Sequence, residues 1–192
     1  MITAGRNAQA RRQAIAAASP HSTRPPVAAA IVLCVSAEAD QPPTIFDWGG
    51  GRDAFERWLN LFYDLVEQDD LVGPVFGGTV GAEHRDHATT WWCEVMGGPS
   101  EYTETRGGYE HMLHQHIGLA ITPEQRLQFV TLLSRAADES GLPADPEFRA
   151  AIIGYAEWGS RLALHNSQPG AAVAEHAPVP RWGWGVAPPY QP

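Results

Sequence analysis

The sequence is poor in cysteine and in basic residues, and both shortages exclude classes of protein. Its two cysteines, Cys34 and Cys93, are far apart and outside any C-x-x-C spacing, so neither a disulfide framework nor a cysteine zinc site is expected. The 192 residues include 13 basic and 22 acidic side chains, a formal net charge of −9. Nucleic acids and anionic membranes are bound through clustered Lys and Arg, so neither is an expected partner.

Long apolar runs are also absent. No segment approaches the ~20 consecutive apolar residues that a membrane-spanning helix needs. The longest run, Val27–Val35, has Arg11 and Arg12 upstream and small residues after it, as in the core of a signal peptide. Pro25 and Pro26 and the long gap from the arginines weaken that interpretation, so we expect a cytoplasmic protein with no membrane partner.

Proline and small residues define the ends of the folded region. Residues 1–43 are rich in Ala, Ser, Pro and Arg without an amphipathic period, which predicts a flexible N-terminal extension. Residues 169–192 contain six prolines and cannot form a helix, so we expect a Pro- and Trp-rich C-terminal tail. Its aromatic residues could lie across the domain as an extended arm. Residues 44–168 are then expected to form one compact domain.

This domain has the signals of helices and no convincing strand alternation, so the fold class is predicted to be all-α. Asp53 and Glu56 resemble a capping box that opens the first long helix. Further helices are expected over roughly 82–96 and 110–119, from Pro123 to about Ser140, and from Pro146 onward. Gly97-Gly98-Pro99 is a strong terminator of the helix over 82–96.

Five of the eight histidines lie between positions 84 and 116. His84 shares the core-facing side of its predicted helix with Ala88, and His116 lies on the apolar stripe of the next helix. A lone inward histidine is usually a hydrogen-bonded core residue. Two of them on separate helices favour a metal or haem pocket, because imidazole is a common ligand of iron.

Several short motifs, in this order and spacing, resemble the group II truncated haemoglobins over residues 44–168. The motifs are Phe62-Tyr63, Gly97-Gly98-Pro99, Tyr102-Thr103-Glu104, His116 ahead of a capped helix, and Tyr155…Ser160…Leu162…Asn166-Ser167. The resemblance implies a truncated globin, a two-over-two helical sandwich around haem b. It further implies that His116 is the proximal ligand of the iron, that Tyr63 is the distal hydrogen-bond donor and that His84 stands at the distal gate.

The same resemblance assigns further residues to the cofactor pocket. Phe76 falls at an aromatic position that packs on the haem, and Ala88 falls where the family often has a larger residue. Phe129 replaces a tryptophan found in many members, so the indole N–H that would steady a bound ligand is missing. His87 and His111 are candidate partners of the haem propionates, with solvated surface histidines as the equal alternative.

The leading functional hypothesis is reversible binding of dioxygen and other diatomic gases at ferrous haem. A second hypothesis is a haem-dependent oxidoreductase, peroxidase-like or oxidising nitric oxide. Because no flavin or nicotinamide motif is present, it would need an external reductase. A third is a haem-free metal site made by four histidines, His84, His87, His111 and His116. A fourth is a domain with a decayed pocket that serves only interaction.

Overall fold

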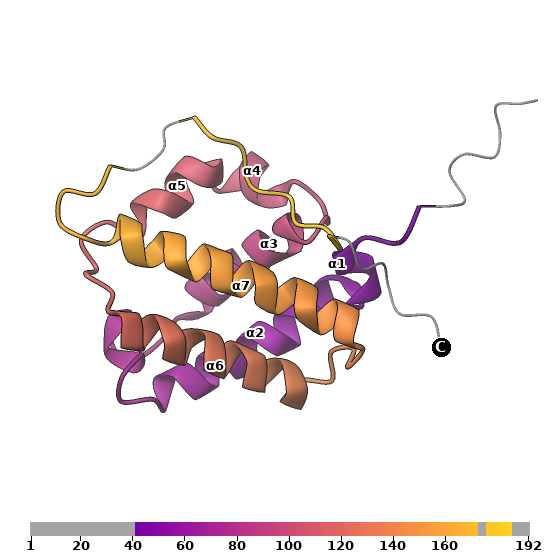
Figure 1. Ribbon diagram of the computed structural model, residues 1–192, viewed down its shortest axis with the longest axis horizontal. Helices are drawn as coiled ribbons and strands as arrows, with labels where there is room; N and C mark the ends of the chain where they lie inside the picture. The colour runs from indigo at the N-terminus through magenta and orange to yellow at the C-terminus, as the bar shows by residue number, and fades with distance from the viewer. Residues whose placement is uncertain (1–40, 173–175, 186–192) are drawn as a thin grey trace, which may run out of the picture. The chain divides into compact units, whose positions relative to one another are not determined.

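The computed structural model describes residues 41–172 and 176–185 (Figure 1). Within these ranges all regular structure is helical, which confirms the all-α prediction. Most of the predicted N-terminal extension, Cys34 and the run Val27–Val35 lie outside the described residues, as do residues 186–192 of the predicted tail.

Four long helices in two layers form the body of the domain. The elements in chain order are α1 (Ile45–Trp48), α2 (Gly51–Glu67), the 3-10 helix η1 (Gly73–Phe76), α3 (Ala82–Val95), α4 (Glu101–Thr105), α5 (Gly108–His114), α6 (Pro123–Glu139) and α7 (Pro146–Asn166). Helix α2 packs against α3 and α6, and α6 packs against α7. In Figure 1 the pair α6–α7 lies in front of the pair α2–α3, the two-over-two arrangement that the sequence led us to expect.

Helix α2 contributes the centre of the core. Its apolar residues recur every three or four positions, and five of them are at most 1% exposed: Phe55, Trp58, Leu59, Phe62 and Val66. The indole N–H of Trp58 donates to the carbonyl of Leu133 over 3.0 Å, which fixes α2 against α6. Burial of such large side chains is the main source of stability in a domain of this size.

The predicted capping box at Asp53 is wrong. Helix α2 begins three residues earlier, after Gly50, which has φ of +96° and no side chain to cap the helix. A left-handed residue at this point turns the chain from α1 directly into α2. Asp53 instead lies in the first turn, where a carboxylate interacts favourably with the helix dipole.

Helices α6 and α7 begin where the sequence predicts. The Thr122 hydroxyl accepts from the Gln125 N–H (3.2 Å), and the Gln125 amide oxygen accepts from the Thr122 N–H (3.0 Å), a complete capping box. The Asp145 carboxylate accepts from the Phe148 N–H over 2.9 Å and caps α7. These side chains satisfy backbone donors that a helix start leaves without partners.

Helix α5 is shorter than predicted. It ends at His114, so His116 lies in the turn that follows and not in the helix. Gly118 and Ala120 both have positive φ, and the Ala120 N–H donates to the carbonyl of Ser167 over 3.0 Å. The chain after α5 is therefore bonded to the end of α7. The short helices α1 and α4, which the sequence did not predict, span only one turn each and show no periodic pattern.

Residues 176–185, the C-terminal arm, contain no helix and run across the domain (yellow in Figure 1). The Trp182 N–H donates to the carbonyl of Val95 over 2.8 Å, and the Arg181 guanidinium donates to the carbonyl of Gly98 over 3.1 Å. The Trp184 indole donates to the carbonyl of Pro43 over 2.7 Å. The arm is thus fixed to the end of α3, to the loop after it and to the chain before α1.

Candidate functional site

A cavity of about 550 Å³ lies among η1, α2, α3, α6, α7 and the segment from α5 to Ile121. Sites for small molecules and cofactors typically measure about 300–1,000 Å³. All eight residues that the sequence singled out line it: Tyr63, Phe76, His84, His87, Ala88, His111, His116 and Phe129. The fold thus brings together side chains that lie up to 66 positions apart, and their individual roles stay predictions.

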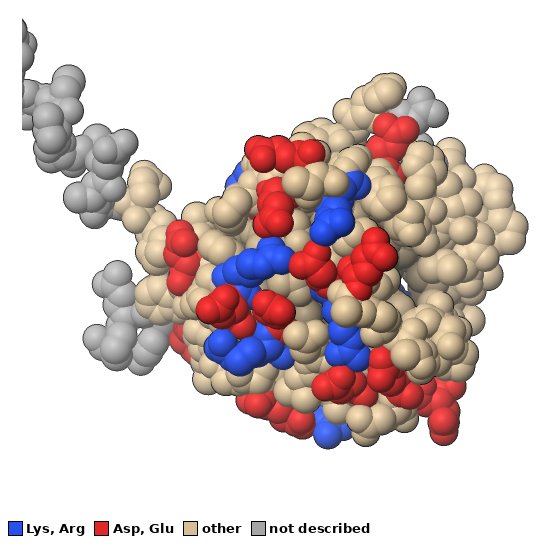
Figure 2. Space-filling model, turned by 180° about the vertical axis from the view of Figure 1, so that it is seen from behind, with Lys and Arg blue, Asp and Glu red and all other residues tan. Residues whose placement is uncertain are grey.

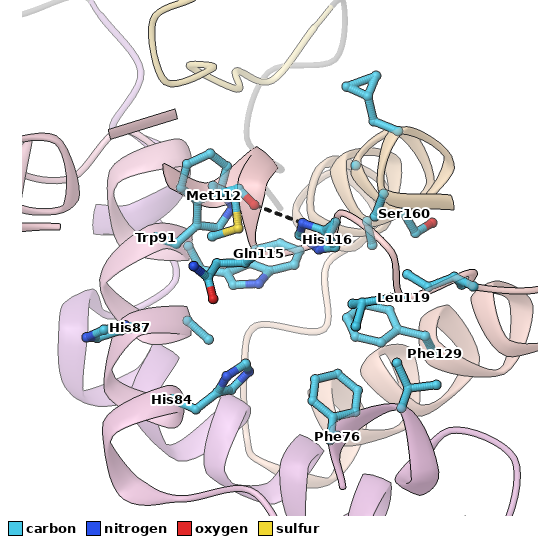
Figure 3. Close-up of a pocket in the computed structure, with 18 of the residues that line it drawn as sticks. Phe76, His84, His87, Trp91, Met112, Gln115, His116, Leu119, Phe129 and Ser160 are labelled. Atoms are coloured by element: carbon cyan, nitrogen blue, oxygen red, sulfur yellow. Dashed lines mark hydrogen bonds between the residues drawn. The ribbon is translucent and has the colours of Figure 1, made fainter. Parts of the chain in front are cut away.

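One side of the cavity is formed by His116 (Figure 3). Its Nδ1 lies 2.9 Å from the carbonyl oxygen of Met112, four residues earlier. A carbonyl can only accept, so Nδ1 carries the proton and Nε2 has a free lone pair. Burial lowers the pKa of His116, and the bond to Met112 opposes this only in part, so the ring is neutral at pH 7.

His84 lies across the cavity from His116 (Figure 3), and its Nε2 is 3.2 Å from the Tyr63 hydroxyl. Burial lowers the pKa of His84, and repulsion from His87 and His116 when they are protonated, and from Arg85, lowers it further. Burial raises the pKa of Tyr63, with a smaller opposing effect from Arg85, so the phenol keeps its proton. Two neutral hydrogen-bonding side chains therefore face each other on this side.

The rest of the wall near these two residues is apolar. The Phe76 ring meets Tyr63 and His84 edge-on, with centroids 5.8 Å and 5.6 Å away. Phe129 packs edge-on against Phe62 at 4.9 Å. Ala88, one turn after His84 on α3, fills little space, so the cavity extends along α3 between the larger side chains.

His87 and His111 also border the cavity. In Figure 3 the His87 ring points away from His84. Its Nε2 is buried without a hydrogen-bond partner among the described residues, and the closest carboxylate oxygen, from Glu83, is 3.8 Å away. An acidic group on a bound molecule would satisfy this nitrogen.

The cavity also has an aromatic wall that sequence reasoning did not identify. Tyr155 and Trp158 of α7 line it together with Trp91 of α3. The Trp91 indole donates to the Tyr155 hydroxyl over 2.8 Å. Apolar periodicity places such residues on an inward face, but it does not distinguish a packed core from the wall of a cavity. The Met112 carbonyl was missed as well, because no side chain marks it.

The alternative of a haem-free metal site finds no support in this geometry. Within residues 41–172 and 176–185, no group of three or more His, Cys, Asp or Glu side chains converges closely enough to hold a metal ion. His84 and His116 lie on opposite sides of the cavity, and His87 points away from His84 (Figure 3).

Charges on the surface are mixed in sign. On the face shown in Figure 2, acidic and basic side chains alternate. Arg52 pairs with Asp86 and Glu101, and Arg106 also pairs with Asp86. No helix among the described residues combines the length and apolarity needed to cross a bilayer.

Comparison with known proteins connects this geometry to a family. The family model for bacterial-like globins matches residues 44–154. The Group 1 truncated hemoglobin GlbN of Nostoc commune and that of a second Nostoc strain are each 30% identical over 76 residues. These matches span 40% of this chain and 60% of each relative, so the chain matches less than two thirds of the length of these proteins.

Solved structures share the fold. The hemoglobin of Chloroflexus aurantiacus is 26% identical with a TM-score of 0.56, covering 64% of this chain and 98% of that one. The group II truncated hemoglobin of Bacillus anthracis is 22% identical with a TM-score of 0.59, covering 68% and 97%. Because the family model spans more than half of the chain and these structures share its helical arrangement, this protein belongs to the bacterial-like truncated globins.

Proposed function

We propose that this globin binds haem b through His116 and holds dioxygen or another diatomic gas on the side of Tyr63 and His84. One observation supports this above all: a neutral imidazole with a free Nε2 borders an apolar cavity opposite two hydrogen-bonding side chains. Ferrous haem, when bound, supplies the iron centre at which diatomic gases bind reversibly.

The residues of the cavity fit such a cofactor. The Met112 carbonyl fixes the tautomer and the orientation of His116, as hydrogen bonds to ligating histidines commonly do. Phe76 and Phe129 offer flat apolar surface to a macrocycle. The unpartnered Nε2 of His87, with His111 also at the cavity, suits the carboxylates of the propionates.

Tyr63 and His84 would control how long a gas molecule stays. Both side chains remain neutral, and their mutual bond of 3.2 Å orients them toward the same space. A bound gas with partial negative charge would accept a hydrogen bond from the Tyr63 O–H or the His84 N–H, in place of the bond between these two side chains. Such a bond slows release, because it must break before the gas leaves.

We also propose membership of group II and a globin domain spanning residues 44–168. The support is the set of motifs Phe62-Tyr63, Gly97-Gly98-Pro99 and Tyr102-Thr103-Glu104, together with contacts beyond the matched region. Ser167, past the end of that region, accepts from the Ala120 N–H and its hydroxyl accepts from the Ile121 N–H. The whole of α7 therefore belongs to the folded domain.

A peroxide reaction is a second candidate function. Neutral His84 can accept a proton, which is the role of a general base toward hydrogen peroxide. Sustained turnover would need electrons from a separate donor or reductase.

The test of the main proposal is His116→Ala. We expect the variant to lose most of its haem, seen as loss of the Soret absorption band of the purified protein. His114→Ala is the matched control, because His114 is exposed and is the last residue of α5, two positions before His116. If His116→Ala purified with full haem and an unchanged ferrous spectrum, the assignment of the ligand would be wrong.

A further inference from the structure

A continuous series of oxidisable side chains connects the cavity to the surface. We call it the aromatic relay; it consists of Trp91, Tyr155, Trp158 and Trp182. Trp91 bonds to Tyr155 (2.8 Å), and the Tyr155 ring lies 5.8 Å from Trp158 and 5.6 Å from Trp182, centroid to centroid. Trp158 and Trp182 are themselves 5.8 Å apart. Each ring therefore touches the next.

We propose that this relay moves electrons from the surface to the cavity, so that a bulky one-electron donor is oxidised at Trp158 and Trp182 without entering the cavity. The proposal rests on the proposed haem function, in its peroxide-reacting form. Indole and phenol are among the side chains that lose single electrons most readily, and aromatic rings in contact can exchange an electron without a covalent path. Three members, Trp91, Tyr155 and Trp158, line the cavity itself.

The inner and outer ends of the relay differ in access to solvent. Tyr155 is buried, and no group in the described ranges accepts a hydrogen bond from its phenol. An oxidised Tyr155 thus has no neighbouring base for its proton and takes an electron from Trp158 or Trp182. Trp158 is 37% exposed, so water can take up the indole proton there. The unpaired electron is therefore expected on Trp158 or Trp182, at the surface end of the relay.

The outermost ring comes from the C-terminal arm, beyond the part of the chain that the globin family model covers. Its position is fixed by the bond from the backbone N–H of Trp182 to the carbonyl of Val95 and by the neighbouring Arg181 contact with Gly98. On α7, the indole packs over Gly154, where an added β-carbon would be in ordinary van der Waals contact, 3.7 Å from the Trp182 ring. Gas binding in the cavity requires none of these features.

The reaction balances with hydrogen peroxide as oxidant. The O–O bond of H₂O₂ breaks, and the peroxide takes up two electrons and two protons to give two molecules of water. Each electron comes from one donor molecule through the relay, so two donors are oxidised per peroxide. Ferrocytochrome c is a suitable probe, because it gives one electron, is too large for the cavity and is cationic, opposite to the net charge of −9.

The first test locates the radicals. The haem-loaded protein is treated with hydrogen peroxide and a nitroso spin trap, and adducts are mapped by peptide mass spectrometry. We expect adducts on Trp182 and Trp158, and loss of the Trp182 adduct in Trp182→Phe. Trp184→Phe is the control, since Trp184 lies on the same arm but packs against Trp48, outside the relay. Adducts confined to residues outside the relay would overturn the proposal.

The second test measures electron delivery. We expect Trp158→Phe and Trp182→Phe to lose most of the peroxide-driven oxidation of ferrocytochrome c, while Trp184→Phe keeps it. Guaiacol, a phenol small enough for the cavity, should still be oxidised by Trp182→Phe. A double variant that oxidises ferrocytochrome c like the wild type would refute the relay and leave haem binding intact. A wild-type protein without a Soret band would refute both proposals.

Discussion

His116 acquires its proposed role from one hydrogen bond. With Nδ1 donating to the Met112 carbonyl, the neutral ring exposes Nε2 as a lone-pair donor beside the cavity. In the opposite tautomer the lone pair would meet the carbonyl oxygen, which also has only lone pairs to offer, so that form is disfavoured. The backbone at Met112 thus selects the form of the imidazole that can bind iron.

Tyr63→Phe should release dioxygen faster. The substitution removes the phenolic donor and keeps the ring that packs against Phe76 and His84. A hydrogen bond to a charged or polarised acceptor contributes about 1.5–3 kcal/mol. At roughly 1.4 kcal/mol per factor of ten, the off-rate should rise about tenfold or more in stopped-flow measurements. Tyr109→Phe, at another part of the cavity wall, is the control, and an unchanged off-rate in Tyr63→Phe would exclude Tyr63 as the main donor.

His84→Leu should leave the number of ligands on the ferrous iron unchanged in the absence of gas. The Tyr63 hydroxyl holds His84 Nε2 at 3.2 Å, so we expect His84 to stay off the iron and act as a donor or gate. Both wild type and variant should then give five-coordinate, high-spin deoxy spectra. A six-coordinate wild type that becomes five-coordinate in His84→Leu would show that His84 is a ligand.

At the level of elements, one arginine joins α2 and α3, the two helices that contribute Tyr63 and His84 to the cavity. Arg85 follows His84 on α3 and donates to the carbonyls of Val80 and Asn60 and to the carboxylates of Asp64 and Glu67. Its guanidinium also lies over the Tyr63 ring, 5.7 Å from the centroid. The position of His84 relative to Tyr63 therefore depends on this contact between α2 and α3.

Glu67→Gln should make the stability of the protein less dependent on pH in the acid range. The Val80 N–H, and then Arg85, lower the pKa of Glu67 in the folded protein. The unfolded chain consequently binds more protons in the acid range. This carboxylate therefore stabilises the fold above its usual pKa, and the contribution is lost as the pH falls from there through the lowered pKa of the folded state. We expect a lower melting temperature at neutral pH and a shallower decline between about pH 5 and 3.

Glu56→Gln provides the comparison, because Glu56 is exposed on the same helix. Melting curves of both variants and the wild type across this pH range test the idea. A Glu67→Gln profile parallel to that of the wild type would show that the contact with Arg85 and Val80 is not linked to proton uptake.

For the whole molecule, the C-terminal arm joins parts of the domain that are distant in sequence. Trp182 packs against Tyr155 and Trp158 of α7, and Trp184 packs edge-on against Trp48 of α1. Through the backbone bond to Val95 the arm also reaches the end of α3. It therefore connects α1, the end of α3 and α7.

Ending the chain at Ala171 should destabilise the globin domain. Each aromatic pair contributes about 0.5–1.5 kcal/mol beyond the area it buries. The truncation removes the two Trp182 pairs and the pair of Trp184 with Trp48, so the free energy of unfolding should fall by roughly 1.5–4.5 kcal/mol. Urea denaturation of the haem-loaded protein measures this. A chain ending at Gly185 retains the arm and should match the full protein. Equal stability of all three chains would mean that the arm contributes nothing.

The sequence determined the features that depend on neighbouring residues. Thr122 with Gln125, and Asp145 ahead of Pro146, set the starts of α6 and α7, because a cap needs only side chains three positions away. Gly97-Gly98-Pro99 set the end of α3 to within one residue. Periodicity and family resemblance also selected His84 and His116, which the fold brings to one cavity.

Only the tertiary structure decided the rest. The path of the chain after α5 is fixed by the bond from Ala120 to Ser167, 47 positions later. The contact of Trp182 with Tyr155 likewise joins the tail to a helix through packing alone. Such partners cannot be identified from neighbouring residues in the sequence. The contacts are stabilising only because distant segments exclude water from each other and satisfy each other's backbone hydrogen-bonding groups.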